Sequence, residues 1–171
     1  MVAQQQQFNQ LVKTQGDKIY RLLSAYLTDK SEVADLYQEV LLNIWQSLPR
    51  FKGDAQLSTW VYRIAVNTAI TYSKKELRRR QQLANPLAEQ YLAVPETRQA
   101  DKEPQLQLLE RCIQQLPEDE RLLIGLVLDN EPYKSIADIL GISINHVGVK
   151  INRAKARLSR LMEKQAWTLN N

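Results

Sequence analysis

The feature that most restricts the fold is a glycine that separates two amphipathic segments near the C-terminal end of the chain. A short apolar pattern follows Pro132 and ends at Gly141, and Ser143 then precedes a longer helical pattern that carries several cations. A glycine permits a tight turn, and a serine can cap the helix that follows. This order predicts a helix-turn-helix over residues 132–158, whose second helix offers polar and basic side chains to a groove of duplex DNA.

Apolar residues recur at helical spacing along almost the whole chain, and no segment shows the alternation typical of a strand. In the N-terminal half we expect a short helix around residues 8–12, a second over 19–27, a third that Ser31 caps, and a fourth that runs from Ser58 or Thr59 to about Gln82. In the C-terminal half, helices over residues 106–116 and 122–127 are expected to precede the helix-turn-helix.

Residues 84–104 interrupt the helical pattern. Three prolines in this segment oppose a continuous helix, and its composition is polar and acidic. A connector of about twenty residues in a compact protein is usually either disordered or functional. We therefore expect an all-α fold of two small helical domains, residues 1–83 and 105–171, joined by a flexible linker.

Positive charge is concentrated in two places. Of the 23 Lys and Arg residues, five lie within residues 74–80 and six within residues 144–164, where the acidic residue is Glu163. The expected linker carries four acidic and two basic residues. Clustered positive charge favours a polyanionic partner, most often nucleic acid, although a solvated, soluble surface explains the charge alone equally well.

Catalysis and metal binding have no support in the residue pattern. The chain has one cysteine, Cys112, and one histidine, His146, and it has no Gly-rich phosphate loop or nucleophile–base pair. We therefore expect no enzyme, no metal site and no cofactor. The longest apolar run, near residues 122–128, is far shorter than the ~20 residues that span a bilayer. The N-terminus also lacks a signal-peptide pattern, so we expect a cytoplasmic protein without direct membrane insertion.

Two of the expected helices have more than one interpretation. The helix over residues 31–46 is apolar around most of its circumference, which favours a central core helix over one that docks a protein partner. The helix over residues 58–82 interleaves aromatic residues with cations, asparagine and threonine. That mixture suits unpaired nucleic acid, because rings stack on bases and cations neutralise phosphates. The alternative for this helix is a core helix with a basic, solvated end.

Several segments resemble those of one known family. FKGDAQLSTWVYRIAVNTA (Phe51–Ala69) is similar to region two of bacterial sigma-70 family factors of the extracytoplasmic-function (ECF) type. DLYQEVLLNIWQ (Asp35–Gln46) is similar to the polymerase-binding helix that precedes it. LPEDERLLIGLVL, SIADILGIS and NRAKARL, which lie between Leu116 and Leu158, resemble region four. Both blocks occur in the family's order, with a linker between them.

The resemblance implies a sigma factor that directs core RNA polymerase to specific promoters and helps to melt the minus-ten element, with no enzymatic activity of its own. The implied partners are core RNA polymerase, through its β′ clamp and β flap, promoter DNA, and an anti-sigma factor. The linker would lie near the RNA exit path of the polymerase. The promoter sequence, the inducing signal and the identity of an anti-sigma factor do not follow from the resemblance.

The resemblance also implies three sets of contact residues. Core polymerase would contact Asp35, Gln38, Glu39 and Leu42. The minus-ten DNA would contact Phe51, Lys52, Asp54, Trp60, Arg63, Asn67, Thr71, Tyr72, Lys74 and Lys75. The minus-thirty-five DNA would contact Ser143, Asn145, His146, Lys150, Arg153 and Lys155.

The chain departs from the family pattern at the start of the DNA-reading helix. Gly148 stands where a basic side chain is common, and Val149 stands where a serine is common, whereas Arg153 keeps a usual contact position. The departure predicts altered or weaker recognition of the minus-thirty-five element, or recognition through Asn145 and His146 instead. A glycine inside a helix costs about 1 kcal/mol relative to alanine, which close approach of the backbone to DNA would explain.

Two other functions fit parts of the chain. A standalone helix-turn-helix regulator would explain residues 105–164, but it leaves the Asp35–Gln46 helix without a role. A protein-binding helical adaptor would show no salt-sensitive affinity for DNA.

Overall fold

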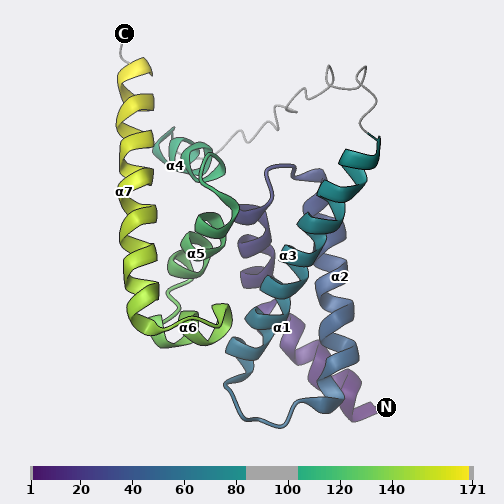
Figure 1. Cartoon of the computed structure of the whole chain (residues 1–171). Helices are drawn as coiled ribbons and strands as arrows, with labels where there is room; N and C mark the ends of the chain where they lie inside the picture. The colour runs from purple at the N-terminus through teal and green to yellow at the C-terminus, as the bar shows by residue number, and fades with distance from the viewer. Residues whose placement is uncertain (1, 84–103, 170–171) are drawn as a thin grey trace.

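The computed structural model describes residues 2–83 and 104–169, and within these ranges it contains α-helices, one short 3-10 helix and no strand (Figure 1). The all-α prediction is therefore confirmed. The helices are α1 (Val2–Tyr26), α2 (Ser31–Ser47), η1 (Leu48–Arg50), α3 (Leu57–Leu83), α4 (Pro104–Gln114), α5 (Glu118–Leu128), α6 (Tyr133–Leu140) and α7 (Ile144–Leu169). The expected linker lies outside the described residues except for its last residue, Pro104, which instead begins α4, a position that proline tolerates.

The first helix is one continuous element, so the prediction of two short helices over residues 8–12 and 19–27 is wrong. Polar residues interrupt the apolar pattern there, but Leu11, Gly16 and Ile19 lie on one buried face of α1. A Cβ at Gly16 would lie 2.8 Å from the hydroxyl of Tyr37 in α2. The glycine therefore permits close contact between α1 and α2, and that packing stabilises a helix whose local pattern looks broken.

Two predicted helix caps are displaced in the structure. Ser31 is the first residue of α2 rather than its cap, and the carboxylate of Asp29 accepts hydrogen bonds from the Ser31 amide (2.9 Å) and hydroxyl (2.7 Å). Helix α3 begins at Leu57, so Ser58 and Thr59 lie inside its first turn. Asp29 thus satisfies the first free amide group of α2 from a position upstream of the helix, in place of a serine cap.

The helix-turn-helix has the predicted local structure. Gly141 ends α6 with a φ of 68°, which is the left-handed conformation that glycine adopts without strain. The hydroxyl of Ser143 accepts a 3.2 Å hydrogen bond from the amide of His146 and so caps α7. Cys112 of α4 is fully buried and packs as a small core residue.

Helices α1–α3 form an N-terminal group and helices α4–α7 a C-terminal group, and the two groups pack directly on each other (Figure 1). Helix α5 lies against α1, and α6 lies against α3. A Cβ at Gly125 of α5 would lie 2.8 Å from the Cδ1 atom of Leu22 and 3.7 Å from the Cβ of Ala25. The glycine thus lets α5 approach the backbone of α1, and one hydrophobic core continues through both groups.

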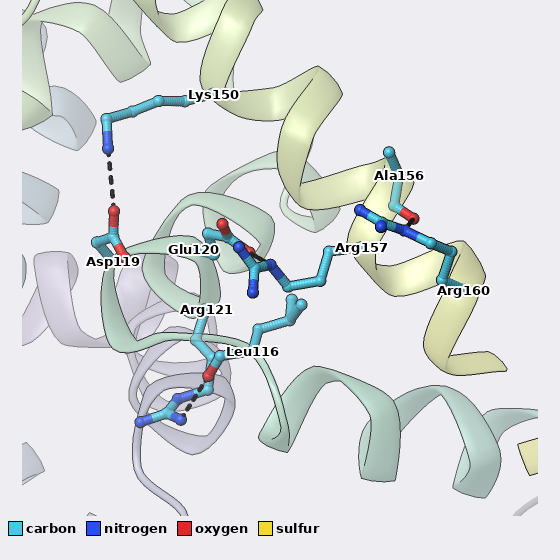
Figure 2. A network of polar contacts seen from close by, with 8 residues as sticks. All are labelled: Leu116, Asp119, Glu120, Arg121, Lys150, Ala156, Arg157 and Arg160. Atoms are coloured by element: carbon cyan, nitrogen blue, oxygen red, sulfur yellow. Dashed lines mark hydrogen bonds and ion pairs between the residues drawn. The ribbon is translucent and has the colours of Figure 1, made fainter. Parts of the chain in front are cut away.

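A buried arginine strengthens this junction. Arg121 of α5 donates from Nε to the carbonyl of Tyr26 at the end of α1 (2.7 Å) and from NH1 to the carbonyl of Leu116 (2.8 Å; Figure 2). Its guanidinium also lies 5.9 Å from the centroid of the Tyr26 ring. Burial lowers the pKa of Arg121 and raises the pKa of Tyr26 to about 12. Carbonyl oxygens therefore satisfy a cation that would otherwise oppose burial.

Candidate protein and nucleic-acid interfaces

Helix α2 has one buried face and one exposed face. Val33, Leu36, Val40 and Ile44 are buried in the core. Asp35, Gln38, Glu39 and Leu42 recur at helical spacing on the opposite face, and all four are exposed, Leu42 to 53%. Within the described residues, none of these four side chains makes a hydrogen bond or an ion pair. Core packing therefore accounts for one side of α2 and leaves an acidic and apolar stripe open to a partner.

Helix α3 carries the cationic surface that the sequence predicts. Arg63, Asn67, Thr71, Lys74 and Lys75 are exposed, and Tyr72 is half-buried. An open hollow of about 540 Å³ lies along the later part of the helix, lined by Thr71, Lys74, Lys75, Arg78, Arg79 and Gln82. Arg79 is paired with Glu76 at 2.8 Å. The remaining cations of this hollow face solvent, where they can approach phosphate groups.

The loop before α3 is built on an aromatic pair. The rings of Phe51 and Trp60 lie 4.9 Å apart at an interplanar angle of 44°. Lys52 and Asp54 are exposed at the turn, where Gly53 has a φ of 79°. The pair holds the loop against the first turn of α3 and brings four of the predicted minus-ten residues into one place.

Arg63 differs from its neighbours on α3 because it already has a partner in the C-terminal group. Its guanidinium donates two hydrogen bonds, of 3.1 and 2.9 Å, to the carbonyl of Asp138 in α6. Sequence reasoning predicted a DNA contact for Arg63 but not this contact. In the closed arrangement, meaning the packing of the two groups on each other, the guanidinium is occupied.

Helix α7 presents most of its predicted DNA-contact residues to solvent. Asn145, His146, Arg153 and Lys155 are exposed, as is the capping residue Ser143. Lys150 instead donates a 2.9 Å hydrogen bond to Asp119 at the start of α5. This contact lowers the pKa of the Asp119 carboxyl. Sequence reasoning missed Asp119, although three consecutive acidic residues at a helix start were the signal for a cation nearby.

A second cation of α7 is paired in the same way. Nε of Arg157 approaches Oε2 of Glu120 at 3.0 Å, an ion pair that lacks hydrogen-bond geometry (Figure 2). Together with Asp119, Glu120, Leu123 and Lys150, the residues His146 and Arg153 line a hollow of about 160 Å³ between α5 and α7. Two ion pairs therefore join one side of α7 to the acidic first turn of α5.

Asp129 is the second residue that sequence reasoning missed. It follows α5, and its side chain is 6% exposed. Its Oδ1 atom accepts hydrogen bonds from Nε (3.2 Å) and NH2 (2.9 Å) of Arg21, and its Oδ2 atom accepts one from the hydroxyl of Tyr62 (2.9 Å). Burial, and then the hydrogen bond to Asp129, raises the pKa of the Tyr62 phenol. One carboxylate thus joins α1 and α3 to the C-terminal group.

Among the described residues, no group of three or more His, Cys, Asp and Glu side chains is arranged to hold a metal ion. In the part of the chain that the structure describes, no helix has the length and apolar character needed to cross a membrane.

Comparison with known proteins identifies the family. Residues 11–80 match Sigma-70 region 2, and residues 106–158 match Sigma-70 region 4. The ECF RNA polymerase sigma-E factor of Escherichia coli K12 is 32% identical over 170 residues, which cover 93% of this chain and 88% of that protein. The chain belongs to the ECF group of the sigma-70 family. The sigma-E factor of Haemophilus influenzae is 31% identical over 166 residues, which cover 91% of this chain and 87% of that protein.

Two solved structures share the fold of this chain. The sigma factor RpoE of Bartonella quintana, in complex with the anti-sigma factor NepR, has a TM-score of 0.73 at 22% identity, over 92% of this chain and 97% of that one. CnrH, in complex with the cytosolic domain of CnrY, has a TM-score of 0.64 at 22% identity, over 94% of this chain and 90% of that one. Sigma factors are non-enzymatic proteins that direct promoter-specific transcription initiation.

The family assignment names the two groups of helices. The region 2 match lies within α1–α3, and the region 4 match lies within α4–α7. The contacts of Arg63, Asp129 and Arg121 therefore join region 2 to region 4 of this sigma factor. The outer faces of α2 and α7 lie on opposite edges of the molecule (Figure 1).

Proposed function

We propose that this sigma factor binds core RNA polymerase, directs it to specific promoters and helps to open the minus-ten element, acting in the cytoplasm without a cofactor or catalytic activity of its own. One observation carries the proposal. A free stripe on α2, a cationic surface on α3 and an exposed face of α7 occur on one chain in the order of sigma regions 2 and 4. A standalone regulator would need the last of these surfaces alone.

The stripe on α2 is the proposed contact for the β′ clamp of the polymerase. Asp35, Gln38 and Glu39 offer hydrogen-bond acceptors, and the amide of Gln38 also offers donors. The exposed Leu42 supplies an apolar anchor at the end of the stripe. Mixed polar and apolar contacts of this kind are typical of interfaces in which few residues supply most of the affinity.

The loop before α3 and the cationic face of α3 are the proposed minus-ten site. Separating stacked base pairs costs roughly 1.4 kcal/mol per step. Stacking of an unpaired base on an aromatic ring returns ~1–3 kcal/mol. The Phe51–Trp60 pair and Tyr72 supply the aromatic surfaces, while Lys74 and Lys75 approach the backbone. Region 2 would thereby trap a strand that opens by thermal fluctuation, without hydrolysis.

Region 4 is the proposed reader of the minus-thirty-five element, and the β flap of the polymerase is its proposed protein contact. The exposed Asn145, His146, Arg153 and Lys155 would contact DNA, as would Lys150 after it exchanges Asp119 for phosphate. The hydroxyl of Ser143 accepts the capping hydrogen bond from the His146 amide and keeps its own O–H to donate to a DNA phosphate.

Promoter binding requires the closed arrangement to open. The minus-ten and minus-thirty-five elements are numbered by their positions on the promoter, so they lie about 25 base pairs apart. This is about 85 Å at 3.4 Å per base pair. A compact chain of 171 residues has a radius of gyration of about 16 Å, so it is about 40 Å across. Regions 2 and 4 would therefore separate on the polymerase, which would release Arg63 from Asp138.

The RpoE structure is a complex with the anti-sigma factor NepR, and we extend a partner of that kind to this chain. An anti-sigma factor that binds both regions would favour the closed arrangement by its differential affinity for that state. The same binding would cover surfaces that the polymerase needs.

Transcription with purified components tests the proposal. Core polymerase with this chain should initiate at promoters selected from genomic fragments, and core polymerase alone should not. Binding of the chain to core polymerase should be measurable without DNA. Absence of both core binding and promoter-dependent initiation would reject the proposal. Tight, specific binding of the chain alone to duplex DNA would favour a standalone regulator, and salt-insensitive behaviour throughout would favour an adaptor.

A further inference from the structure

The outward face of α7 has a chemical character that the charge of the helix does not indicate. Asn145, Val149, Asn152 and Ala156 follow one another at steps of four, three and four residues, so they lie on one side of the helix. All four are exposed, Val149 to 48%. The opposite side holds the buried Val147, Ile151 and Ala154. The side that can enter a groove therefore carries two amides and a branched apolar residue at its front.

Two cations of α7, Lys150 and Arg157, lie beside this face rather than on it, whereas the exposed Arg153 borders it one turn after Val149. Lys150 and Arg157 turn toward the first turn of α5, where they pair with Asp119 and Glu120 (Figure 2). The side chains of Asn145 and Asn152 make no hydrogen bond within the described residues, so both amides are available to a ligand. A Cβ at Gly148 would lie 3.9 Å from the Tyr133 ring of α6, so Gly148 lies toward α6, while the next residue, Val149, is exposed on the outward face.

The chemistry of this face matches one pair of bases. In the major groove an asparagine amide reads the N6 and N7 atoms of adenine, and an apolar side chain contacts the 5-methyl group of thymine. Reading guanine in the same way requires an Arg or Lys fork directed at O6 and N7. The four residues of the outward face of α7 include no Arg or Lys that could form this fork.

We propose that Val149, Asn145 and Asn152 are specificity-determining residues that select A·T base pairs in the duplex that region 4 reads. Val149 contacts a thymine methyl group, and the two asparagines on either side of it read adenines. Arg153 and Lys155, on the two flanks of this face, neutralise phosphates of the backbone. The inference rests on the proposed function, because it assumes that α7 enters the major groove of promoter DNA.

A promoter selection with the complete holoenzyme tests the inference. Core polymerase and the full chain select from a library in which the upstream element is random, and the recovered sequences are read. We expect adjacent A·T pairs in the recovered upstream element. The same selection with Val149→Arg should shift one of these positions toward guanine, because arginine on the outward face supplies a guanidinium fork that reads guanine. Recovery of G·C pairs by the native chain at every specified upstream position would overturn the proposal.

Removal of a single methyl group gives a sharper test. In the selected promoter each thymine of the upstream element is replaced, one at a time, by deoxyuridine, which lacks the 5-methyl group. Loss of one buried methyl corresponds to about a fourfold weaker holoenzyme affinity, and we expect this loss at one position. Val149→Ala should abolish the sensitivity at that position. Val2→Ala, which truncates another exposed valine far from α7, in α1, should leave it unchanged.

The possible outcomes separate this inference from the function on which it rests. If the native holoenzyme initiates normally but tolerates every deoxyuridine, or if Val149→Ala retains the methyl sensitivity, the specificity role of Val149 is wrong and the sigma function stands. If no promoter-dependent initiation occurs, the proposed function itself fails. Val149 is exposed, so its substitution should not unfold the chain, and an unchanged melting temperature confirms that the variants are native.

Discussion

The hydroxyl of Tyr62 in region 2 donates a 2.9 Å hydrogen bond to Oδ2 of Asp129 in region 4. Both side chains are largely removed from water, and the other oxygen of the carboxylate accepts from Arg21. This contact is polar and has a fixed geometry, so regions 2 and 4 have a defined relative position when closed. Opening would expose the apolar contacts of α5 with α1 as well as this hydrogen bond, so a partner must bind the open state more tightly to favour it.

Tyr62 and Asp129 should be energetically coupled. We expect Tyr62→Phe to lower the free energy of unfolding by about 1 kcal/mol, and Asp129→Ala by about 1–3 kcal/mol because it leaves the buried hydroxyl without an acceptor. The double variant should lose less than the sum of the two. Urea unfolding followed by circular dichroism measures all three values. Strict additivity would show that the hydrogen bond does not contribute to stability in solution.

Asp119→Asn should strengthen binding of the holoenzyme to upstream promoter DNA. The substitution frees Lys150 from its 2.9 Å ion pair and leaves it available to phosphate. One additional phosphate contact should steepen the salt dependence of binding by about one unit of log–log slope. Stability should change little, because exposed ion pairs contribute ~0–1 kcal/mol. Fluorescence anisotropy with a labelled promoter measures the affinity, and Asp17→Asn, which removes the same charge from α1, is the matched control.

The pair of Asp119 and Lys150 should persist throughout the neutral range. Hydrogen bonding to Lys150 lowers the pKa of the Asp119 carboxyl below its ordinary value of 3.8. The stability that it contributes is therefore present above pH 3.8 and is lost only as pH falls through the lowered pKa. The gain in DNA affinity from Asp119→Asn should accordingly be the same at mildly acidic and mildly alkaline pH. A gain that disappears on either side of neutrality would contradict this assignment.

Glu131 should make the protein less stable as the pH rises from acidic to neutral. Burial raises the pKa of its carboxyl above the ordinary 4.5, against the opposing effect of Lys18. The folded state therefore holds this proton more tightly than the unfolded state, and that stabilisation is complete below pH 4.5 and is lost as pH rises through the raised value. Glu131→Gln should raise the melting temperature at neutral pH but not below pH 4.5. An equal effect at both pH values would point to altered packing instead.

Gly148→Ala should stabilise region 4 without impairing promoter binding. An added Cβ would lie 3.9 Å from the Cε2 atom of Tyr133, an ordinary contact, so the substitution should gain up to about 1 kcal/mol of helix stability. Gly148 lies toward α6 rather than on the outward face of α7, so we expect unchanged affinity of the holoenzyme for its promoter. Reduced affinity with a raised melting temperature would show that the backbone at Gly148 approaches DNA closely.

The stripe on α2 should be necessary for polymerase binding and unnecessary for folding. Replacing Gln38 and Glu39 with alanine removes two exposed polar side chains from α2 and leaves its buried face intact. We expect core polymerase to bind the double variant at least about tenfold more weakly, as for an interface hot spot. The melting temperature should be unchanged. The same change at Gln6 and Gln7, two exposed residues of α1, should leave core affinity at the native value.

Local features of the chain could be predicted because they depend on neighbouring residues. The helix-turn-helix follows from the order of an apolar stripe, Gly141 and Ser143, whose glycine turn and serine cap involve residues within one turn. The exposed stripe of α2 was placed by the family resemblance, since its apolar pattern by itself favoured a core helix. The local pattern also predicted a break in the first helix that the structure does not have, because α1 is continuous through Gly16, where it packs closely on Tyr37 of α2.

The sequence alone therefore determined the helical class, the two blocks with their order, and the local geometry of the turn into α7, since periodicity and capping act over a few residues. Only the tertiary structure decided which groups those blocks leave available. Arg63 donates to the carbonyl of a residue 75 positions away, and Lys150 donates to a carboxylate 31 positions away. Tyr62 donates to Asp129, 67 positions away. Such partners are chosen by the packing of helices distant in the chain, and no local hydrogen-bond or spacing rule encodes that choice.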